Sequence, residues 1–287
     1  MTATSGELAD VRSGSKADIE QPYAAFYAIE MPKAFTRAVS PRLSDCELTH
    51  LERKQIDIEK ARLQHSAYER ILEQNGLEVI RLPDLPSHPD GVFVEDTALL
   101  LSEHAIITRP GAASRLAETD STAAGLAGHF DLHRIENGFV DGGDVLRIGQ
   151  TLYVVLSSRT DEGGVRDLRA IGARIGFDVV RAELAGCLHL KTGATFAGLD
   201  RAGIPVLLFH PASVDSSQFA SVDAMAVHES EPAAANCLSI GGRLVLSAGN
   251  QRTAEMLRRR GFDLVEVDVS ELQKAEAGLT CMSLIEQ

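Results

Sequence analysis

The feature of this sequence that most constrains its fold is a short motif that recurs five times. Most copies follow a segment with helical periodicity, and each reads as an apolar strand with an acidic or basic residue inside it. The copies are GLEVIRL at 76–82, FDLHRI at 130–135, GFDVVR at 176–181, VDAMAV at 222–227 and GFDLVEV at 261–267. Their spacing of roughly 40–50 residues is typical of a repeat architecture.

Each copy is followed by a polar loop and then by a second apolar strand. The second strands are predicted at residues 92–99, 143–146, 188–192, 236–240 and 279–283. The first four continue into a third strand, predicted at residues 105–108, 152–156, 205–209 and 244–247. The fifth has no third strand after it. A strand at residues 35–39 can supply the missing one, so that the two ends of the array would close a ring.

This pattern predicts an α/β fold, a five-bladed α/β propeller of ββαβ units with pseudo-fivefold symmetry. The alternative is a doubly wound α/β sheet with coincidental echoes. No Gly-x-Gly-x-x-Gly opens a helix, and the glycine pairs fit hairpins and tight turns. A helix is predicted over residues 57–75, ending at Gly76. Residues 1–24, rich in Ser, Ala, Gly and charge, predict a weakly ordered extension, and residues 25–287 a single domain.

Charge and cysteine content narrow the class of partner. The chain has 28 Lys and Arg against 41 Asp and Glu, and its net charge of −13 argues against nucleic acid and anionic lipid. No apolar run reaches membrane-spanning length, and the first residues lack a signal peptide's hydrophobic core. The cysteines at 46, 187, 237 and 281 are too widely spaced for a disulfide framework or a zinc site. A cytoplasmic location, with reduced thiols and no membrane partner, is therefore expected.

Reactive side chains fall into register when the five second strands are aligned. They are Glu95 and Asp96, Asp141 and Asp144, His189, Asn236, and Cys281. Inner strands that converge on an axis would bring these groups around one cavity. Each has a structural alternative when taken alone. Cys281 stands in an apolar run and could be a small core residue, and the Glu95–Asp96 pair could form an internal salt bridge with Arg109. Their coincidence at equivalent positions favours a shared polar site.

The residue types in this set indicate covalent catalysis. A thiolate and a histidine form a nucleophile–acid/base pair, here Cys281 and His189. A carboxylate beside the imidazole would orient it and keep it protonated, and Asp141 or Asp144 could take this part.

The charged residues around the pair indicate the class of substrate. Glu95 and Asp96 would form a negative cage that suits a guanidinium, and a cation bound there would also lower the pKa of the thiol. Arg115 and Arg159 end or follow third strands and could hold a substrate carboxylate at the rim. Alternatively, Arg115 and Arg159 are exposed residues at the starts of helices. Together the two sets of charges describe an arginine-like amino acid.

A set of short motifs gives the chain a family resemblance. They are DGVFVED at 90–96, ITRPG at 107–111 with SR at 114–115, DGGDV at 141–145, SRT at 158–160, LHLK at 188–191, ANC at 235–237 and LTC at 279–281. From about Phe35 onward the sequence resembles the dimethylarginine dimethylaminohydrolases, cysteine enzymes of the guanidino-group-modifying (pentein) superfamily with a five-bladed α/β propeller.

The resemblance implies a role for each matching residue. Cys281 would be the nucleophile, His189 the general acid and then the base, and Asp141 the carboxylate that supports His189. The remaining implied contacts are to substrate: Asp96 with Glu95 close behind for the guanidinium, Asp90 for the α-amino group, Arg115 and Arg159 for the carboxylate, and backbone groups of Leu48 and Ala275.

The resemblance also implies an activity. The expected reaction is hydrolysis of Nω,Nω-dimethyl-L-arginine, or of Nω-methyl-L-arginine, to L-citrulline and the amine through a covalent S-alkylthiouronium on Cys281. The expected partner is this small molecule, with no metal or organic cofactor, and the protein would be a monomer or homodimer. Alternatives are an arginine deiminase, a hydrolase of another substituted guanidine, and a catalytically inactive binding propeller. Arginine deiminases carry His-x-Asp where this chain has His189 and Lys191, which favours a methylated substrate.

Overall fold

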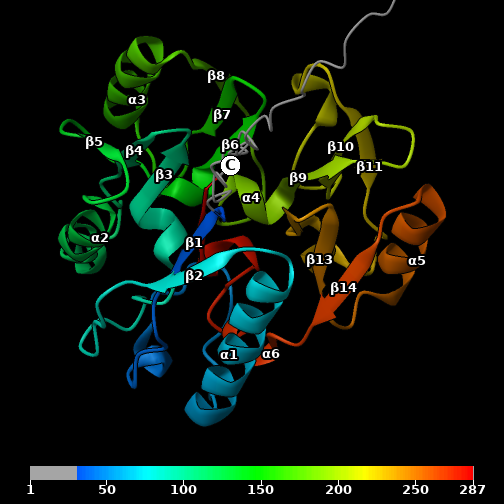
Figure 1. The fold of residues 1–287 in the computed structure, drawn as a ribbon, viewed down its shortest axis with the longest axis horizontal. Coiled ribbons are helices and arrows are strands. Elements are labelled where there is room, and N and C mark those ends of the chain that lie inside the picture. Colours follow the sequence, from blue (N-terminus) through cyan, green and yellow to red (C-terminus); the bar gives the residue numbers. More distant parts are fainter. Residues whose placement is uncertain (1–30, 287) are drawn as a thin grey trace, which may run out of the picture. The chain divides into compact units, whose positions relative to one another are not determined.

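The computed structural model describes residues 31–286, and its strands form five sheets of three strands each, arranged around a ring (Figure 1). In every sheet the middle strand pairs antiparallel with an inner strand and parallel with an outer strand. The sheets are β15-β1-β2, β3-β4-β5, β6-β7-β8, β9-β10-β11 and β12-β13-β14. The predicted five-bladed α/β propeller is therefore confirmed.

The middle strands form the apolar centre of each blade. They are β1 (Lys33–Thr36), β4 (His104–Ile107), β7 (Thr151–Val155), β10 (Pro205–Phe209) and β13 (Arg243–Ser247), and most of their residues are buried. The outer strands are half-exposed: β2 (Glu78–Arg81), β5 (Asp131–Arg134), β8 (Asp178–Ala182), β11 (Asp223–Ala226) and β14 (Leu264–Val267). The recurring motif of the sequence is this outer strand, whose charged residues face solvent while its apolar residues pack inward.

The inner strands begin later than the sequence predicts. They are β3 (Ala98–Leu101), β6 (Val145–Ile148), β9 (Ala194–Leu199), β12 (Leu238–Ile240) and β15 (Leu284–Ile285). Four of the five predicted second strands instead overlap a single helical turn: η2 (Val94–Thr97), η4 (Gly142–Asp144), α4 (Leu190–Gly193) and η7 (Thr280–Met282). In the remaining blade the turn η6 (Pro232–Ala235) comes just before the predicted strand. Placing the reactive residues on strands was therefore wrong. A short apolar run suits a buried turn as well as a buried strand, and periodicity does not separate the two.

The first blade closes the ring, as predicted. β15 pairs antiparallel with β1 through Phe35↔Leu284 and Ala34↔Ile285, and β1 pairs in parallel with β2. Phe35 is fully buried and packs edge-on against Phe130 of the next blade, with ring centroids 5.8 Å apart. The strand order thus joins segments from the two ends of the described chain into one sheet.

Four helices connect middle to outer strands on the rim of the ring (Figure 1). They are α1 (Ile58–Gln74), α2 (Glu118–Leu126), α3 (Glu162–Ile175) and α5 (Gln251–Arg260). The helix predicted over 57–75 is confirmed: Asp57 caps it by accepting the Lys60 amide at 3.0 Å, and Gly76 follows it with a φ of +86°. The β10–β11 connection has only η5 (Ser216–Gln218), and its proline and serines are weak helix formers. The remaining elements are η1 (Leu43–Asp45), η3 (Ala113–Arg115) and α6 (Ser270–Gln273).

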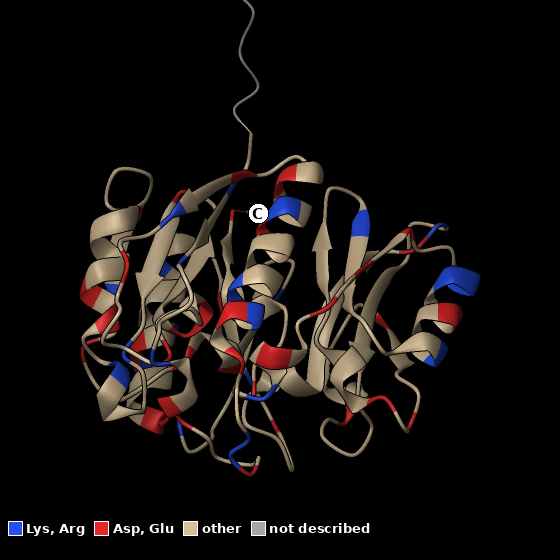
Figure 2. Ribbon diagram, turned by 90° about the horizontal axis from the view of Figure 1, so that it is seen from below, with Lys and Arg blue, Asp and Glu red and all other residues tan. Residues whose placement is uncertain are grey.

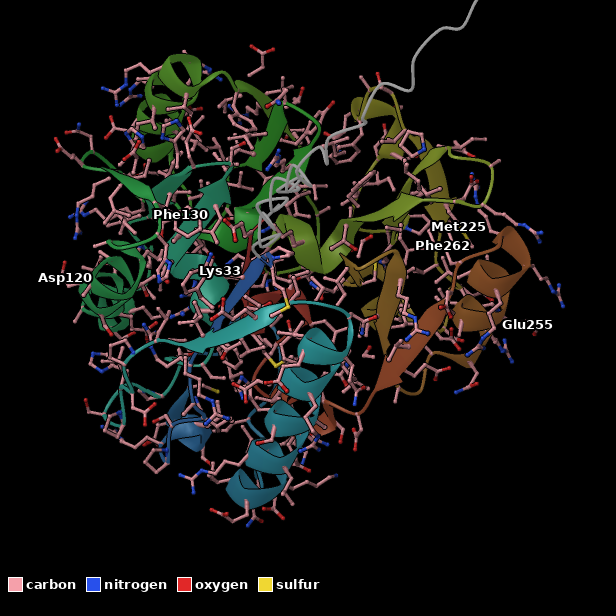
Figure 3. The ribbon with its side chains drawn as sticks, viewed as in Figure 1. Lys33, Asp120, Phe130, Met225, Glu255 and Phe262 are labelled. Carbon is pink, nitrogen blue, oxygen red and sulfur yellow. The ribbon has the colours of Figure 1, made fainter. Side chains whose placement is uncertain are left out.

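Charged side chains occupy the outer surface in both signs. Figure 2 shows Lys and Arg beside Asp and Glu on the outer helices, and in Figure 3 Asp120 on α2 and Glu255 on α5 lie at opposite outer edges of the ring. No helix among residues 31–286 is both long and apolar enough to cross a membrane. The extension predicted for residues 1–24 lies outside the described residues.

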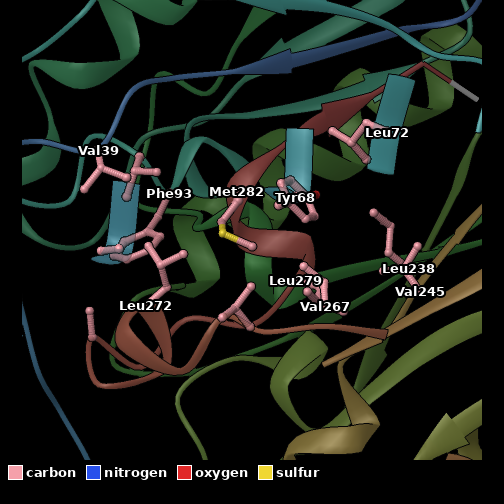
Figure 4. Packing of buried hydrophobic residues seen from close by; sticks show 14 of the residues in the cluster. Val39, Tyr68, Leu72, Phe93, Leu238, Val245, Val267, Leu272, Leu279 and Met282 are labelled. Atoms are coloured by element: carbon pink, nitrogen blue, oxygen red, sulfur yellow. The ribbon is translucent and has the colours of Figure 1, made fainter. Parts of the chain in front are cut away.

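The largest apolar cluster packs α1, the β12–β14 sheet and the η7 turn together (Figure 4). Tyr68 of α1 is fully buried, and its hydroxyl lies 2.6 Å from the Ser283 hydroxyl. Leu279 and Met282 are also fully buried in this cluster. Complete burial of such side chains contributes about 1.5–3 kcal/mol each. The cluster therefore fixes the backbone on both sides of Cys281.

Candidate active site

Four of the five inner turns converge on one pocket at an end of the ring's axis. Asp96 belongs to η2, Asp141 and His189 immediately precede η4 and α4, and Cys281 lies in η7. The full lining is Glu47, Asp90, Phe93, Asp96, Arg115, Asp141, Arg159, Leu188, His189, Ala275, Glu276, Ala277 and Cys281. Residues separated by almost 200 positions thus share one cavity, as the ring predicts.

The turn that carries Cys281 is held by hydrogen bonds as well as by the apolar cluster. The Thr280 amide donates to Asn236 Oδ1 at 3.1 Å, and Asn236 Nδ2 donates to the Thr280 hydroxyl at 3.0 Å. A Cβ at Gly278 would lie 2.3 Å from Asn236 Cγ, so only glycine lets the chain pass there. The Gly278 amide in turn faces Cys281 Sγ at 3.3 Å. Asn236 therefore supports the turn from behind and does not line the pocket.

The imidazole of His189 is buried between carboxylates. Its Nε2 lies 3.1 Å from Asp141 Oδ2, and its Nδ1 lies 3.8 Å from Asp96 Oδ1. Burial lowers the pKa of His189, but the Asp96 charge, the Asp141 hydrogen bond and the Asp144 charge outweigh it and raise this pKa to about 9. The histidine is therefore an imidazolium at neutral pH, the form that can donate a proton.

The two candidate partners of His189 separate in the structure. Asp141, fully buried, reaches His189 with one oxygen and accepts the Gly111 amide with the other at 2.8 Å. Asp144 instead accepts from the Ser157 hydroxyl at 2.5 Å and the Leu190 amide at 3.3 Å, and burial raises its pKa. The direct supporting carboxylate is thus Asp141, whereas Asp144 holds the start of α4.

Asp96 and Arg115 form a buried ion pair in the wall of the pocket. Arg115 Nη1 lies 2.5 Å from Asp96 Oδ2, and the Gly143 amide donates to Asp96 Oδ1 at 3.1 Å. The guanidinium of Arg115 also bonds Glu118 at 2.9 Å and is only 4% exposed. Arg115 therefore lines the pocket as a buried residue and not at an exposed rim, because Glu118 three residues along draws its guanidinium inward. Its contact with a substrate carboxylate stays a prediction. The opposite charges of His189 and Arg115 outweigh burial and lower the pKa of Asp96.

Glu95 lies behind the pocket and does not line it. Its carboxylate accepts from Lys191 Nζ at 2.8 Å and from the Thr280 hydroxyl at 2.7 Å. All three residues line a second cavity on the axis, between the inner strands. Arg109, the alternative partner of the acidic pair, instead donates to the Gly138 carbonyl at 3.0 Å and stacks on Phe139. Glu95 and Lys191 therefore neutralise each other behind the pocket. Of the two adjacent acids Glu95 and Asp96, only Asp96 lines the pocket.

The mouth of the pocket is formed by Asp90, Arg159 and a loop that contains Glu47. Asp90 accepts the Glu47 amide with both oxygens at 3.2 Å, and burial raises the pKa of Asp90 to about 6. Arg159 Nη2 donates to the Thr49 hydroxyl at 3.1 Å. Leu48 lies in the same loop but packs against the apolar cluster and does not line the pocket, whereas Ala275 lines it.

Several lining residues escaped the sequence analysis. Glu47, Phe93, Glu276 and Ala277 line the pocket, and Glu118 neutralises Arg115 in its wall. The spacing of Glu118 three residues after Arg115 could have predicted their ion pair, because residues three apart are neighbours on a helical turn. The acidic residues 47 and 276 had none, since their role depends on where two loops meet.

One group of described residues has donor atoms close enough to hold a cation. Oxygens of Asp96 and Asp141 and a nitrogen of His189 lie within 4.8 Å of one another, all buried. A cation there would have to compete with the proton of His189 and with Arg115. The expectation that the site uses no metal or cofactor stays a prediction.

The thiol of Cys281 is expected to react slowly with neutral reagents at pH 7. Burial, together with the charges of Glu95 and Asp96, raises the pKa of Cys281 well above its ordinary value. The thiolate fraction, and with it the rate of alkylation by iodoacetamide, should rise about tenfold per pH unit from 7 to 9. Mass spectrometry of the Cys281 peptide measures this rate separately from the other three thiols. A rate that is flat from pH 6 to 9 would mean that the thiolate is already formed.

Gly143→Ala is expected to displace His189. A Cβ at this position would lie 2.7 Å from His189 Nδ1 and 3.0 Å from Asp96 Oδ1. A shift of the imidazole by about 1 Å would reduce kcat roughly 10²-fold. Gly128→Ala is the matched control, since a Cβ there meets no atom within 4 Å. Circular dichroism should show both variants folded; wild-type turnover in Gly143→Ala would mean that the imidazole position is not critical.

The comparisons with known proteins agree with this geometry. A scan of protein-family models finds no match. The chain is 37% identical to an N(G),N(G)-dimethylarginine dimethylaminohydrolase of Pseudomonas aeruginosa over 231 residues, which cover 79% of this chain and 89% of that one. It is 36% identical to a protein of the same name from Streptomyces coelicolor over 257 residues, 88% of this chain and 96% of that one. The chain belongs to the dimethylarginine dimethylaminohydrolase family.

Solved structures support the same placement. The Pseudomonas aeruginosa enzyme, as a cysteine-to-serine mutant complexed with citrulline, superposes with a TM-score of 0.81 at 34% identity, covering 89% of this chain and all of that one. The N-terminal domain of ArgZ, a cyanobacterial arginine dihydrolase, superposes with a TM-score of 0.78 at 18% identity, covering 90% of this chain and 98% of that domain. The second likeness concerns the fold alone. The predicted family and fold are thus confirmed.

Proposed function

We propose that this chain hydrolyses Nω-methylated L-arginines to L-citrulline and the methylamine. The observation that carries the proposal is the convergence of Cys281, His189, Asp141 and Asp96 on one pocket, in a chain whose relatives bear the name of this activity. The protonated imidazole and the buried thiol are the two groups that displacement of an amine from a guanidinium needs.

The first half of the reaction forms a covalent intermediate. The guanidinium binds beside Asp96, and its positive charge lowers the pKa of the Cys281 thiol, which loses its proton to solvent. The sulfur then bonds to the guanidinium carbon. The bond from that carbon to the methylated nitrogen breaks as His189 gives that nitrogen its proton. The amine departs, and an S-alkylthiouronium remains on Cys281.

The second half releases the product. Water enters the place of the amine, and the neutral His189 takes one of its protons as the hydroxyl oxygen bonds to the same carbon. The carbon–sulfur bond then breaks while the hydroxyl oxygen becomes the carbonyl of citrulline and gives its remaining proton to solvent. The thiolate and the imidazolium are thereby restored, and citrulline departs. Asp141 keeps the imidazole oriented through both transfers, and each transfer contributes roughly 10²–10⁴-fold.

The floor of the site supports a methylated substrate over free arginine. A second carboxylate opposite Asp96 would grip the other terminal nitrogen of an unsubstituted guanidinium. Here Lys191 stands at that place in the sequence, but its side chain pairs with Glu95 at 2.8 Å behind the pocket and does not line it. With Asp96 as the carboxylate for the guanidinium and no second one supplied from position 191, one terminal nitrogen is held and the other is free to carry methyl groups.

Product analysis tests the proposal. Ammonia and alkylamine release are compared for arginine, monomethylarginine and asymmetric dimethylarginine, with citrulline measured in each case. Faster release of amine from the methylated substrates is expected. Faster ammonia release from arginine would indicate a deiminase. A binding propeller without activity would release no amine, and its thiol would not be alkylated faster by 2-chloroacetamidine, a cation, than by neutral chloroacetamide.

The setting of the enzyme follows from the same residues. All four cysteines are free in the structure, which supports a reducing compartment such as the cytoplasm. We propose that the protein acts there as a monomer or homodimer on a small-molecule substrate, without nucleic acid or membrane partners.

A further inference from the structure

A short loop crosses the mouth of the pocket and is held at both ends by carboxylates. We call residues 47–51 the strap. At its first end the Glu47 amide donates to both oxygens of Asp90 at 3.2 Å, and the Ser114 hydroxyl donates to Glu47 Oε1 at 2.6 Å. Asp90, Glu47 and Glu276 all line the pocket. The strap therefore spans from one wall of the pocket to the other.

At its second end the strap wraps its backbone around Glu276. Three successive amides point at this one carboxylate: Thr49 at 3.0 and 3.1 Å, His50 at 2.6 Å and Leu51 at 2.5 Å. Consecutive amides that converge on an anion form a strong binding concavity. Leu48 packs against the apolar cluster, but the Leu51 side chain is 52% exposed. Beyond Leu48 the strap is therefore held by polar contacts, three amides to Glu276 and the Thr49 hydroxyl to Arg159.

The backbone of Glu276 is strained. Its φ is +60°, and among the described residues only Ser102 and Ser221 are other non-glycine residues with a positive φ. Such a conformation costs of order 1 kcal/mol or more for a residue with a side chain and none for glycine. A side chain kept at this position despite the strain indicates that its carboxylate is needed.

The pocket is too small for substrate while the strap is in place. Its free volume is about 30 Å³, which holds one or two water molecules. Glu47 of the strap and its anchor Glu276 both line this pocket, so a movement of the strap away from Glu276 would enlarge it, and its return would enclose a bound arginine derivative. The strap also fixes Arg159 through the Thr49 hydroxyl at 3.1 Å. Closing it thus sets the arginine that would meet the substrate carboxylate.

We propose that Glu276 is a positioning residue that latches the strap over bound substrate. The identity of the bound substrate rests on the proposed function, whereas the attachment of the strap to Glu276 does not. Glu276 does not touch the reacting atoms. By closing the strap it sets Arg159 and the backbone of Glu47 around the amino-acid end of the ligand and slows that ligand's escape.

The test uses Glu276→Gly, which removes the carboxylate and relieves the strained backbone together. KM for dimethylarginine and the dissociation rate of citrulline should each rise roughly tenfold, the effect of losing charge-assisted hydrogen bonds, while kcat does not fall. Glu52→Ala is the matched control, because it removes an exposed acid next to the strap. Glu276→Gln, which keeps one acceptor oxygen, should lie between wild type and Glu276→Gly.

A second readout does not depend on the substrate. Alkylation of Cys281 by iodoacetamide at fixed pH should be faster in Glu276→Gly than in wild type and Glu52→Ala, because an open strap exposes the sulfur. This readout stands even if the wild type proves inactive on methylated arginines, which would overturn the proposed function alone. Unchanged KM and unchanged alkylation in Glu276→Gly overturn the latch. A lower melting temperature with neither readout altered shows a structural role and overturns it too.

Discussion

Cys281→Ser is expected to reduce turnover of dimethylarginine by about 10⁴-fold or more, because a serine hydroxyl in this pocket has no adjacent neutral base to activate it. His189 is an imidazolium with a pKa of about 9 and so does not accept the serine proton at neutral pH. Binding should survive, since Asp96, Arg115 and Arg159 are untouched. Steady-state amine release and calorimetric titration with citrulline measure the two effects separately.

The control for this variant is Cys237→Ser. Cys237 is also in an inner segment, is only 1% exposed and lies 3.0 Å from the Thr195 hydroxyl, but it does not line the pocket. The Cys237→Ser variant should have a lower free energy of unfolding than the wild type but should retain its activity. Substantial turnover by Cys281→Ser would show that the reaction does not pass through a bond to this sulfur.

His189→Asn is expected to lower kcat/KM by roughly 10²–10⁴-fold, the contribution of one acid–base group. Asparagine is too short to replace the Nε2 contact with Asp141, but Asp141 keeps its hydrogen bond from the Gly111 amide and Asp96 keeps its pairing with Arg115, so the fold should persist. The thermal midpoint checks that it does.

The pH profile separates an acid–base role from a structural one. In the wild type, kcat/KM should rise with the Cys281 thiolate fraction and stop rising at about pH 9, because the His189 imidazolium has a pKa of about 9 and then loses the proton that the leaving amine requires. In His189→Asn the rise should continue past pH 9. A variant that is slow but retains the same break would assign it to another group.

The sequence predicted the ring because the repeats carry the same pattern and because the fifth lacks one strand. That deficit predicted that the strand at Phe35 completes the blade of the last segment, and the pairing of β1 with β15 confirms it. It also placed Asp96, Asp141, His189 and Cys281 together, since equivalent positions in a ring meet at its axis. The repeat symmetry therefore predicted these long-range contacts, which local secondary-structure propensity cannot predict.

Other features depend on interactions that the repeat does not specify. The inner turns were predicted as strands because a few apolar residues suit either state. Arg115 was expected at the rim, but Glu118 and Asp96 together hold its guanidinium in the buried wall of the pocket. Glu276 gave no signal, because it acts through the amides of a loop more than 200 residues away. Tertiary electrostatics decided the positions of Arg115 and Glu276.

The first blade has a consequence for how the protein is made. β1 and β2 leave the ribosome early, but β1 gains its antiparallel partner only when β15, about 250 residues later, has been synthesised. Until then one edge of β1 has unpaired amides and carbonyls, a template for wrong pairing between nascent chains. The other four sheets are each contiguous in sequence and can assemble as they emerge. A translation product truncated before β15 would thus have four complete blades and a fifth blade in which β1 has an unpaired edge that can pair with other chains.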